Sequence, residues 1–299
     1  MKFAPIIYLI GMLLCILSAF MLVPALVDWY YNGDDWPAFI ASSLTTLFIG
    51  GGLFLSNRGS ATEHLELRQA FLLTNSAWIS IALCGSLPFL FSEINMSFTD
   101  AIFESTSGIT TTGATVIKNL ELTSHGILIW RALLQWLGGV GIIVMALAIL
   151  PMLSIGGMQL FKTESYETPD KVVPKAASFA AGISIVYITL TIIWALMLWG
   201  AGMPVFDSIA HSMTTLATGG YSTKSSSLAA FNSSYIELII IFGMIVGSLP
   251  FVHYLSITKN GWKNLINDDQ VKLFLSIVFF VILIISIYLT SKNIPYIEA

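Results

Sequence analysis

Two short segments hold the small oxygen-bearing side chains and glycines that could do chemistry in this sequence. Residues 105–117 read STSGITTTGATVI and residues 208–223 read SIAHSMTTLATGGYST, and neither contains Asp, Glu, Lys or Arg. Glycine adopts backbone angles that other residues avoid, so Gly113 and Gly220 can direct consecutive carbonyls at one ion. Because no carboxylate falls in either segment, the pattern favours selection of a cation by neutral dipoles over selection by a charged ring. The alternative is that both segments are simply polar loops.

The two segments belong to an internal repeat. Asp100 aligns with Asp207, and the same constant offset pairs Ile102 with Ile209, Ser105 with Ser212, Thr111 with Thr218, and Gly113 with Gly220. No gap is needed between the aspartate and the glycine. Each unit reads as a long apolar span, a short amphipathic helix, a Thr/Gly loop and a second long span. Such repetition favours a quasi-symmetric assembly around a shared axis.

The short helices must position the loops that follow them. Each is expected to begin near its aspartate, Asp100 or Asp207, which suits the helix dipole and can act as a cap. The C-terminal end, with partial negative charge, then points inward and favours a cation in a central cavity. The loop returns outward with carbonyls facing the axis, as in filters where carbonyl rings replace the hydration shell of potassium.

The composition places these elements in a membrane. Of the residues, 56% are hydrophobic and 10% are charged, whereas a soluble domain carries about 25% charged residues. About 20 apolar residues cross a bilayer, and seven stretches lacking charged residues approach or exceed that length: 3–27, 36–57, 69–92, 132–161, 176–206, 238–258 and 273–291. The scattered basic residues exclude a nucleic-acid partner. Cys15 and Cys84 lie in apolar runs and read as buried hydrophobes.

Loop charges predict the orientation. With the N-terminus in the cytoplasm, nine basic residues face the cytoplasm and four face outward, as the positive-inside rule requires. The cytoplasmic set is Lys2, Arg58, Arg68, Lys162, Lys171, Lys175, Lys259, Lys263 and Lys272, and the outer set is Lys118, Arg131, Lys224 and Lys292. The first outer loop contains Asp28, Asp34 and Asp35 and no basic residue.

These motifs resemble a known family. GITTTGATV at 108–116 and ATGGYST at 217–223 are similar to the first two filter loops of the TrkH/KtrB superfamily of potassium-uptake membrane subunits. The stretch WRALLQWLGGVGIIVMALAILPMLSIGGMQLFKTE at 130–164 resembles the inner helix of that family's first repeat and the loop after it. The resemblance implies an all-α polytopic protein with a helix pair at 1–57, M1–pore-helix–M2 repeats at 67–161 and 176–258, and the first helix of a third repeat at 271–299.

The resemblance also implies roles for individual residues. It assigns the potassium-binding filter to Thr111, Thr112, Gly113, Thr218, Gly219 and Gly220. Residues that support the filter are Thr110, Ala114, Ala217, Tyr221, Asp100 and Asp207. In related plant transporters a serine at the first filter glycine accompanies sodium preference, so Gly113 favours potassium. The only bound species expected is the transported potassium ion, with no covalently bound cofactor.

Other implications concern the whole protein. The family has four repeats, so the chain is expected to be an N-terminal portion of a longer protein, or a truncated product. The resemblance implies an inner-membrane location, a homodimer, and a cytosolic nucleotide-binding partner of the TrkA/KtrA kind for which residues 162–175 are a candidate docking loop. The alternative reading of 162–175 is a solvated loop.

Two competing functions fit the sequence less well. A sodium- or proton-coupled secondary transporter would need buried charged residues at the bilayer midplane. An enzyme would need clustered catalytic groups, which the sequence does not contain. Glu104 is expected either to accept backbone N–H groups or to contact an ion. Arg131 lies at the outer interface, where snorkelling costs little, so a structural role is expected for it. The glycines at 138–141 are expected to allow close helix approach or a bend. The four histidines lack metal-ligand spacing, and His211 is expected to form a hydrogen bond.

Overall fold

The computed structural model describes residues 3–60, 67–153, 172–251, 253–255 and 263–291. Every regular element within these ranges is a helix, which confirms the predicted all-α class. The chain divides into two units, Met1–Ser248 and Leu249–Ala299.

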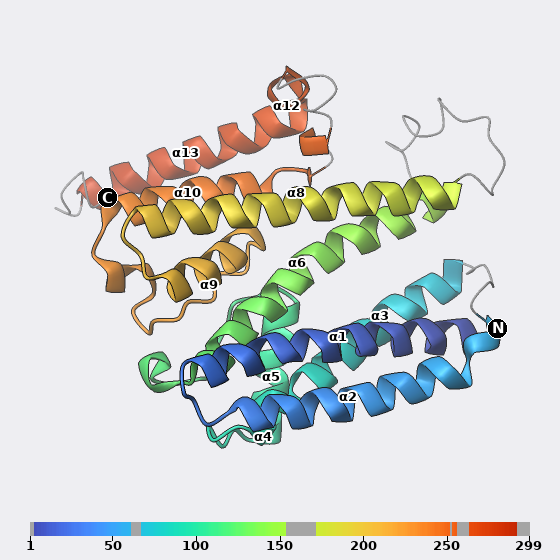
Figure 1. The fold of residues 1–299 in the computed structure, drawn as a ribbon. Coiled ribbons are helices and arrows are strands. Elements are labelled where there is room, and N and C mark those ends of the chain that lie inside the picture. The colour runs from blue at the N-terminus through green and yellow to red at the C-terminus, as the bar shows by residue number, and fades with distance from the viewer. Residues whose placement is uncertain (1–2, 61–66, 154–171, 252, 256–262, 292–299) are drawn as a thin grey trace. The chain divides into compact units, whose positions relative to one another are not determined.

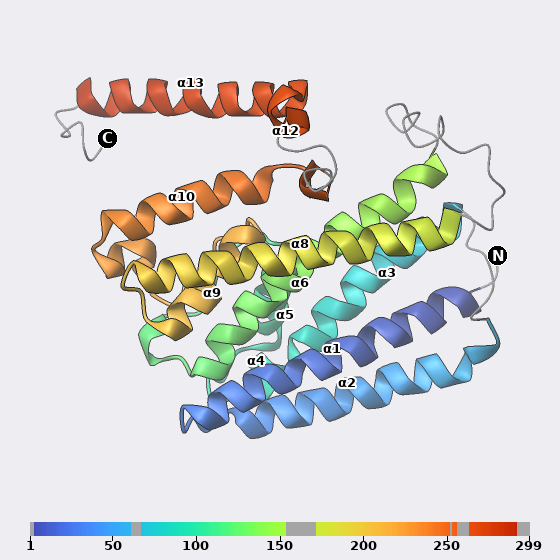
Figure 2. The same cartoon turned by 45° about the horizontal axis from the view of Figure 1, so that its top comes forward.

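The first unit opens with a helical hairpin. Helices α1 (Ala4–Tyr30) and α2 (Trp36–Ser56) lie along one another (Figures 1 and 2). Small residues allow this close approach, because a Cβ added to Gly11 would lie 2.7 Å from the carbonyl oxygen of Gly50. The Ser43 hydroxyl donates to the Ser18 carbonyl across the pair at 2.8 Å. A short 3₁₀ turn, η1 (Arg58–Ser60), follows.

Two buried carboxylates fasten the turn between α1 and α2 to residues 93 and 124–126. Asp28 accepts the backbone N–H of Asp35 at 2.8 Å and that of Gly126 at 3.0 Å. Asp35 accepts the N–H of Glu93 and the hydroxyl of Ser124. Two of the three acidic residues of this turn, Asp28 and Asp35, are thus structural anchors, because a buried carboxylate is tolerated where donors surround it.

The next elements are α3 (Leu67–Gly85), α4 (Leu87–Phe91), α5 (Phe98–Ile109), the 3₁₀ turn η2 (Leu120–Leu122) and α6 (His125–Leu153). The span predicted at 69–92 is confirmed as a spanning segment at 68–91, with a one-residue interruption at Ser86. Pro88 follows the break and cannot donate to a continuing helix. The freed carbonyl of Gly85 accepts the indole N–H of Trp130 at 3.0 Å, which satisfies it within the protein.

A second series follows with the same order of elements. It consists of α8 (Val172–Gly200), α9 (Val205–Leu216), η4 (Ser227–Phe231) and α10 (Ser234–Ser248). The last helix begins before the predicted start at 238, and it ends before Pro250 instead of continuing to 258. Proline disfavours helical geometry in the residue that precedes it, which accounts for the early end.

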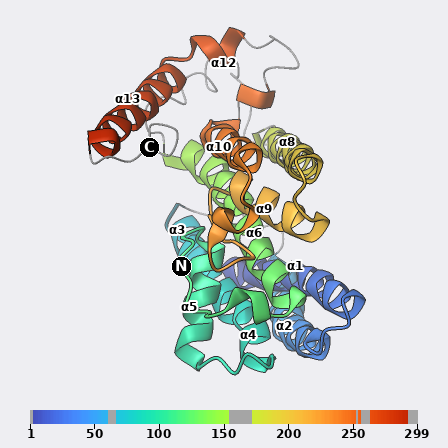
Figure 3. The same ribbon diagram turned by 90° about the vertical axis from the view of Figure 1, so that its left-hand side faces the viewer.

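Helix α6 joins the two series, because it contacts both short helices, α5 and α9 (Figures 1 and 3). Its buried side chains Ile127, Trp130 and Leu134 belong to the largest apolar cluster, together with Phe39 of α2 and Phe89 of α4. The loops after α5 and α9 are therefore positioned from one shared helix.

Five helices among the described residues are long and apolar enough to cross a membrane. They are 4–30, 36–56, 68–91, 180–200 and 269–291, and Ser234–Ser248 is a shorter apolar helix. Helix α6 has 29 residues, more than a span needs. The chain is a multi-pass membrane protein.

The second unit contains α12 (Lys263–Asn267) and α13 (Asp269–Ser291). The Asp268 carboxylate accepts the N–H groups of Gln270 and Val271 at the start of α13, which is a helix cap. Most apolar side chains along α13 are exposed, and the helix is long and apolar enough to cross a membrane.

Candidate functional site

The two short helices begin in matching ways. Ser97 is the N-cap of α5, and its hydroxyl accepts the N–H of Asp100. Pro204 occupies the same place before α9, so Asp100 and Asp207 both lie at the third helical position. The prediction that the aspartates cap the helices is wrong, because each lies inside the first turn. There they still suit the helix dipole.

The two aspartates are held differently. The exposed Asp100 carboxylate accepts the Ser97 hydroxyl at 2.8 Å. The Asp207 carboxylate is 5% exposed and accepts the hydroxyl of Thr223 at 2.5 Å. Asp207 therefore links the start of its helix to the chain that returns from the loop, whereas Asp100 makes only a local contact.

Both helices end in the same hydrogen-bonded motif. After α5, the N–H of Thr111 bonds to the Gly108 carbonyl and the N–H of Thr112 bonds to the Ser107 carbonyl. After α9, the N–H of Thr218 bonds to the Thr215 carbonyl and the N–H of Gly219 to that of Thr214. This is a Schellman C-cap, which usually places glycine where these loops place threonine.

The backbone angles of the two loops also match. Thr111 has φ 55° and Gly113 has φ 80°, while Thr218 has φ 54° and Gly220 has φ 81°. The intervening residues, Thr112 and Gly219, do not have positive φ. A positive φ is unusual for a β-branched residue, and such strain costs about 1–3 kcal/mol per residue.

The loop glycines are required for different reasons. A Cβ on Gly113 would overlap the carbonyl oxygen of Gly219, so Gly113 needs both its φ and its lack of a side chain. Gly220 needs only its φ, because a Cβ there would meet nothing within 4 Å. Gly219 needs only space, because its Cβ would overlap the side chain of Gln135. The two loops are thus in direct contact at Gly113 and Gly219.

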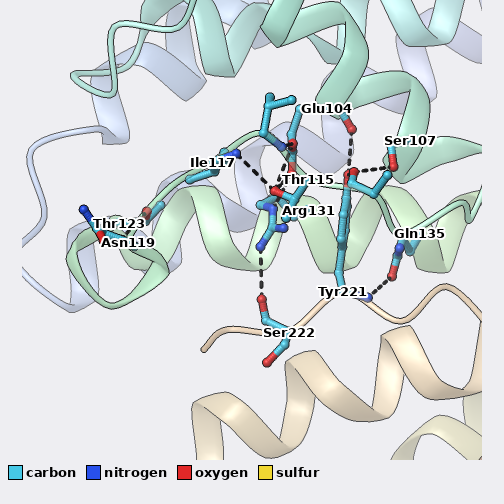
Figure 4. Close-up of polar contacts among 12 residues, drawn as sticks. Glu104, Ser107, Thr115, Ile117, Asn119, Thr123, Arg131, Gln135, Tyr221 and Ser222 are labelled. Atoms are coloured by element: carbon cyan, nitrogen blue, oxygen red, sulfur yellow. Dashed lines mark hydrogen bonds and ion pairs between the residues drawn. The ribbon is translucent and has the colours of Figure 1, made fainter. Parts of the chain in front are cut away.

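Gln135 of α6 lies at this junction. Its side chain is 0% exposed, and its Oε1 accepts the N–H of Tyr221 at 3.1 Å (Figure 4). No hydrogen-bond partner for its Nε2 is present among the described residues. Sequence reasoning missed Gln135, although a lone amide within the apolar stretch 132–153 is a signal of interhelical contact.

A buried ion pair holds the first loop. Arg131 and Glu104 are 1% and 0% exposed, and the Arg131 Nε lies 2.7 Å from a Glu104 carboxylate oxygen. The same carboxylate accepts the Thr115 hydroxyl at 2.9 Å and the Val116 N–H at 3.0 Å. Backbone contact by Glu104 is therefore confirmed. The structural role expected for Arg131 is confirmed, and its partner Glu104 lies inside the protein.

Tyr221 connects the second loop to the first loop and to α5. Its hydroxyl lies 3.0 Å from the Glu104 carbonyl and 3.2 Å from the Ala114 carbonyl, within donor range of both (Figure 4). The Arg131 guanidinium lies over the Tyr221 ring at 4.1 Å, a cation–π contact, and donates to the Ser222 carbonyl at 3.0 Å. One arginine therefore contacts the second loop and the carboxylate that holds the first.

The second loop has a neutral counterpart of the Glu104 contact. His211, which the repeat aligns with Glu104, is 3% exposed and lies 3.0 Å from the Ser222 hydroxyl through Nε2 and 2.8 Å from the Asp207 carbonyl through Nδ1. Because the carbonyl can only accept, Nδ1 carries the proton and Nε2 accepts from Ser222. A hydrogen-bonding role for His211 is confirmed.

The remaining predicted site residues lie around the loops. Thr110 and Thr112 have exposed side chains whose hydroxyls are 2.8 Å apart. The Ala114 carbonyl also accepts the Ser107 hydroxyl at 2.6 Å. Ala217 is buried at the end of α9. Within the described residues, no group of three or more His, Cys, Asp or Glu could hold a metal ion.

Glycines in α6 let both short helices approach it. A Cβ on Gly138 would overlap the carbonyl oxygen of Ile109, the last residue of α5. A Cβ on Gly139 would lie 3.1 Å from the Cα of Ala217, just after α9. In α10, a Cβ on Gly247 would lie 2.9 Å from the Leu216 carbonyl oxygen, the counterpart of the Gly138 contact. Close helix approach, expected from these glycines, is confirmed.

Comparisons with known proteins agree on the kind of protein. The chain is 39% identical to the Trk system potassium uptake protein TrkH of Escherichia coli K12 over 298 residues, covering 98% of this chain and 62% of that protein. It is 36% identical to the Trk system potassium uptake protein TrkI of Halomonas elongata over 296 residues, 98% of this chain and 60% of that protein.

The structural comparison points the same way. The crystal structure of the potassium transporter TrkH from Vibrio parahaemolyticus superposes with a TM-score of 0.88 at 37% identity, covering 97% of this chain and 60% of that one. The chain thus spans about 60% of the length of these relatives. The family model described as "TrkH: Cation transport protein" matches residues 36–294. The chain belongs to the TrkH family of cation transport proteins.

Proposed function

We propose that this chain forms part of a potassium-uptake pore, in which the loops after α5 and α9 supply two of the segments that line a selectivity filter. The carbonyls of Thr111, Thr112, Thr218 and Gly219 would replace part of the hydration shell of potassium. The observation that carries the proposal is the shared backbone, with positive φ at the first and third loop residues in both series. The names of the relatives, which are potassium uptake proteins, support it.

The electrostatic surroundings support a neutral filter. The one carboxylate close behind the first loop, Glu104, is paired with Arg131 and accepts two further hydrogen bonds. It is therefore committed within the protein and is not free to bind an ion. Asp207 is likewise engaged by Thr223. Cation selection then falls to backbone and hydroxyl oxygens.

The larger organisation is part of the same proposal. We take 1–57 as an added helix pair, 67–161 and 176–258 as two M1–pore-helix–M2 repeats, and 271–299 as the first helix of a third. The protein would lie in the inner membrane with its N-terminus in the cytoplasm, as the distribution of basic residues favours. It would act as a homodimer with a cytosolic nucleotide-binding subunit of the TrkA/KtrA kind. Residues 154–171, which hold most of the proposed docking loop 162–175, lie outside the described residues.

Complementation and ion competition test this function. The complete gene product is expressed in a strain that lacks its own potassium-uptake systems, and growth is followed at low external potassium. We expect growth to be restored, and we expect potassium and rubidium, but not sodium, to compete for uptake of labelled rubidium. A protein that reaches the membrane and fails to restore uptake, or that is inhibited equally by sodium, would contradict the proposal.

A further inference from the structure

We propose that Gln135 is a positioning residue for ion selectivity, because its carboxamide sets the separation of the two filter loops. This inference rests on the proposed function. It assigns a specific role to a side chain that touches neither the ion path nor the lipid, since Gln135 is fully buried in the first unit.

The carboxamide, Gly219 and Gly113 form three successive layers. The Gln135 side chain fills the space where a Cβ of Gly219 would lie, and the Gly219 carbonyl oxygen fills the space where a Cβ of Gly113 would lie. Because these groups are in contact, neither the Gln135 side chain nor the peptide of Gly219 can move closer to the next residue in the series. The position of the carboxamide therefore fixes the position of one peptide of the second loop, and that peptide bounds the first loop.

Hydrogen bonding fixes the orientation of the carboxamide. The Tyr221 N–H is a donor, so the atom facing it must be Oε1, and the amide nitrogen then lies on the opposite side (Figure 4). A Cβ built on Gly113 would lie 3.8 Å from that nitrogen. The carboxamide is thus placed with its acceptor on the second loop and its donor near the first. A leucine would fill similar volume and lose both polar atoms, whereas a glutamate would keep the acceptor alone.

Gln135 also belongs to a rigid helix face. Arg131, Gln135, Gly138 and Gly139 follow the i, i+4, i+7, i+8 pattern of one side of α6, and all four contact the loops or the short helices that precede them. Met244 in α10 has the same sequence offset from Gln135 that Gly247 has from Gly138, and its side chain is 54% exposed. The second series therefore provides a matched position without this contact.

The test compares Gln135→Leu, Gln135→Glu and the control Met244→Leu in the complete gene product. Two quantities are measured for each: the ratio of potassium to sodium uptake, and the difference in unfolding temperature of the purified protein in potassium and in sodium, which reports selective binding without transport. For Gln135→Leu we expect the uptake ratio to fall about tenfold, the size of effect produced by about one lost hydrogen bond, and the temperature difference to shrink. Gln135→Glu should lie between this variant and the wild type, and Met244→Leu should match the wild type.

Each outcome separates this inference from the proposed function. Wild-type protein without potassium selectivity in either measurement would overturn the function itself. Selective wild-type protein together with an unchanged ratio in Gln135→Leu would overturn only the role of Gln135. If Gln135→Leu yields no folded protein, Gln135→Glu decides by the same two measurements. Loss of folded protein in both variants would also overturn the inference, since Gln135 would then be needed for folding and not for selectivity.

Discussion

The loops that follow α5 and α9 have positive φ at the same two positions and end their helices with the same pair of hydrogen bonds. The side chains behind them differ. Glu104 and Arg131 form a buried ion pair behind the first loop, whereas His211 and Ser222 form a neutral hydrogen bond behind the second. Tyr221 extends from the second loop onto the first, and its counterpart Ala114 offers only a carbonyl in return.

This comparison indicates which part of each loop the proposed function needs. A carbonyl filter depends on the path of the backbone, and the two loops agree on that path. The supporting side chains need only hold the path in place, and quite different chemistry does so. The supports are also unequal, since α6 of the first series hydrogen-bonds to the second loop and also pairs with Glu104, which holds the first.

The largest expected difference comes from removing the side chain of the short helix, α5 or α9, that lies behind each loop. Glu104→Ala leaves Arg131 buried without its partner, which should destabilise the protein by about 3–5 kcal/mol. His211→Ala removes two hydrogen bonds between neutral groups and should cost about 1–3 kcal/mol. Thermal unfolding of the purified variants measures both. Equal losses would mean that the ion pair is no stronger a support than the neutral pair.

Substitution of the loop glycines should separate the effect of steric overlap from the effect of backbone strain. Gly113→Ser introduces a side chain at φ 80° that also overlaps the Gly219 carbonyl, whereas Gly220→Ser faces only the strain of φ 81°. Strain alone costs about 1–3 kcal/mol. We expect both variants to lose preference for potassium over sodium and Gly113→Ser to lose more, as read from competition of sodium with labelled rubidium uptake. A larger effect at Gly220 would contradict the layered contact of the loops.

The helix glycines offer a matched series of smaller effects. A Cβ on Gly138 would overlap the Ile109 carbonyl oxygen, a Cβ on Gly247 would lie 2.9 Å from the Leu216 carbonyl oxygen, and a Cβ on Gly141 would meet nothing within 4 Å. Gly138→Ala should destabilise the protein by about 1–3 kcal/mol, the usual cost of overpacking. Gly247→Ala should cost less, and Gly141→Ala should be neutral or slightly stabilising, because alanine favours helix. Unfolding temperatures in one detergent give the order directly, and a different order would refute the proposed contacts.

The smallest effect concerns the hydrogen-bonded link between the two segments that follow the loops, at Glu121 and Ser225. Glu121 accepts the N–H and the hydroxyl of Ser225, and these hydrogen bonds lower the pKa of the Glu121 carboxyl. Because the folded-state pKa lies below the unfolded value, the stabilisation is present above the unfolded pKa, about 4.3 for glutamate, and is lost as the pH falls through the folded pKa. The carboxyl is exposed, so the contribution is small. Wild-type and Glu121→Gln unfolding temperatures should differ slightly at neutral pH and converge in acid, and a difference that grows in acid would exclude this link.

Much of the fold follows from residue pattern. Apolar length predicted the spanning helices, and the internal repeat located α5, α9 and their loops, because these features depend on local composition. The break at Ser86 and the early end of α10 were not predicted, although proline follows each at Pro88 and Pro250. The apolar windows around them read as continuous, and hydropathy alone does not register a lost backbone donor.

The sequence predicted the backbone conformation of the loops but not the side chains that hold the loops in place. The glycines at 113 and 220 predicted a positive φ at both positions, because a positive φ is a local property that glycine favours. The partners of Arg131 and Gln135 lie 27 and 86 residues away in sequence, at Glu104 and Tyr221, so no local pattern specifies them. The repeat itself gave no help, because the residues of α10 that correspond to Arg131 and Gln135 are the apolar Ile240 and Met244.

Direct location of the ion would test the central claim, that the two loops line one potassium path. The complete gene product would be crystallised in rubidium, and anomalous scattering would locate the bound ions. The account predicts rubidium peaks beside the carbonyl oxygens of Thr111, Thr112, Thr218 and Gly219, at distances typical of direct coordination. Peaks away from both loops, or well-ordered loops without rubidium, would contradict it.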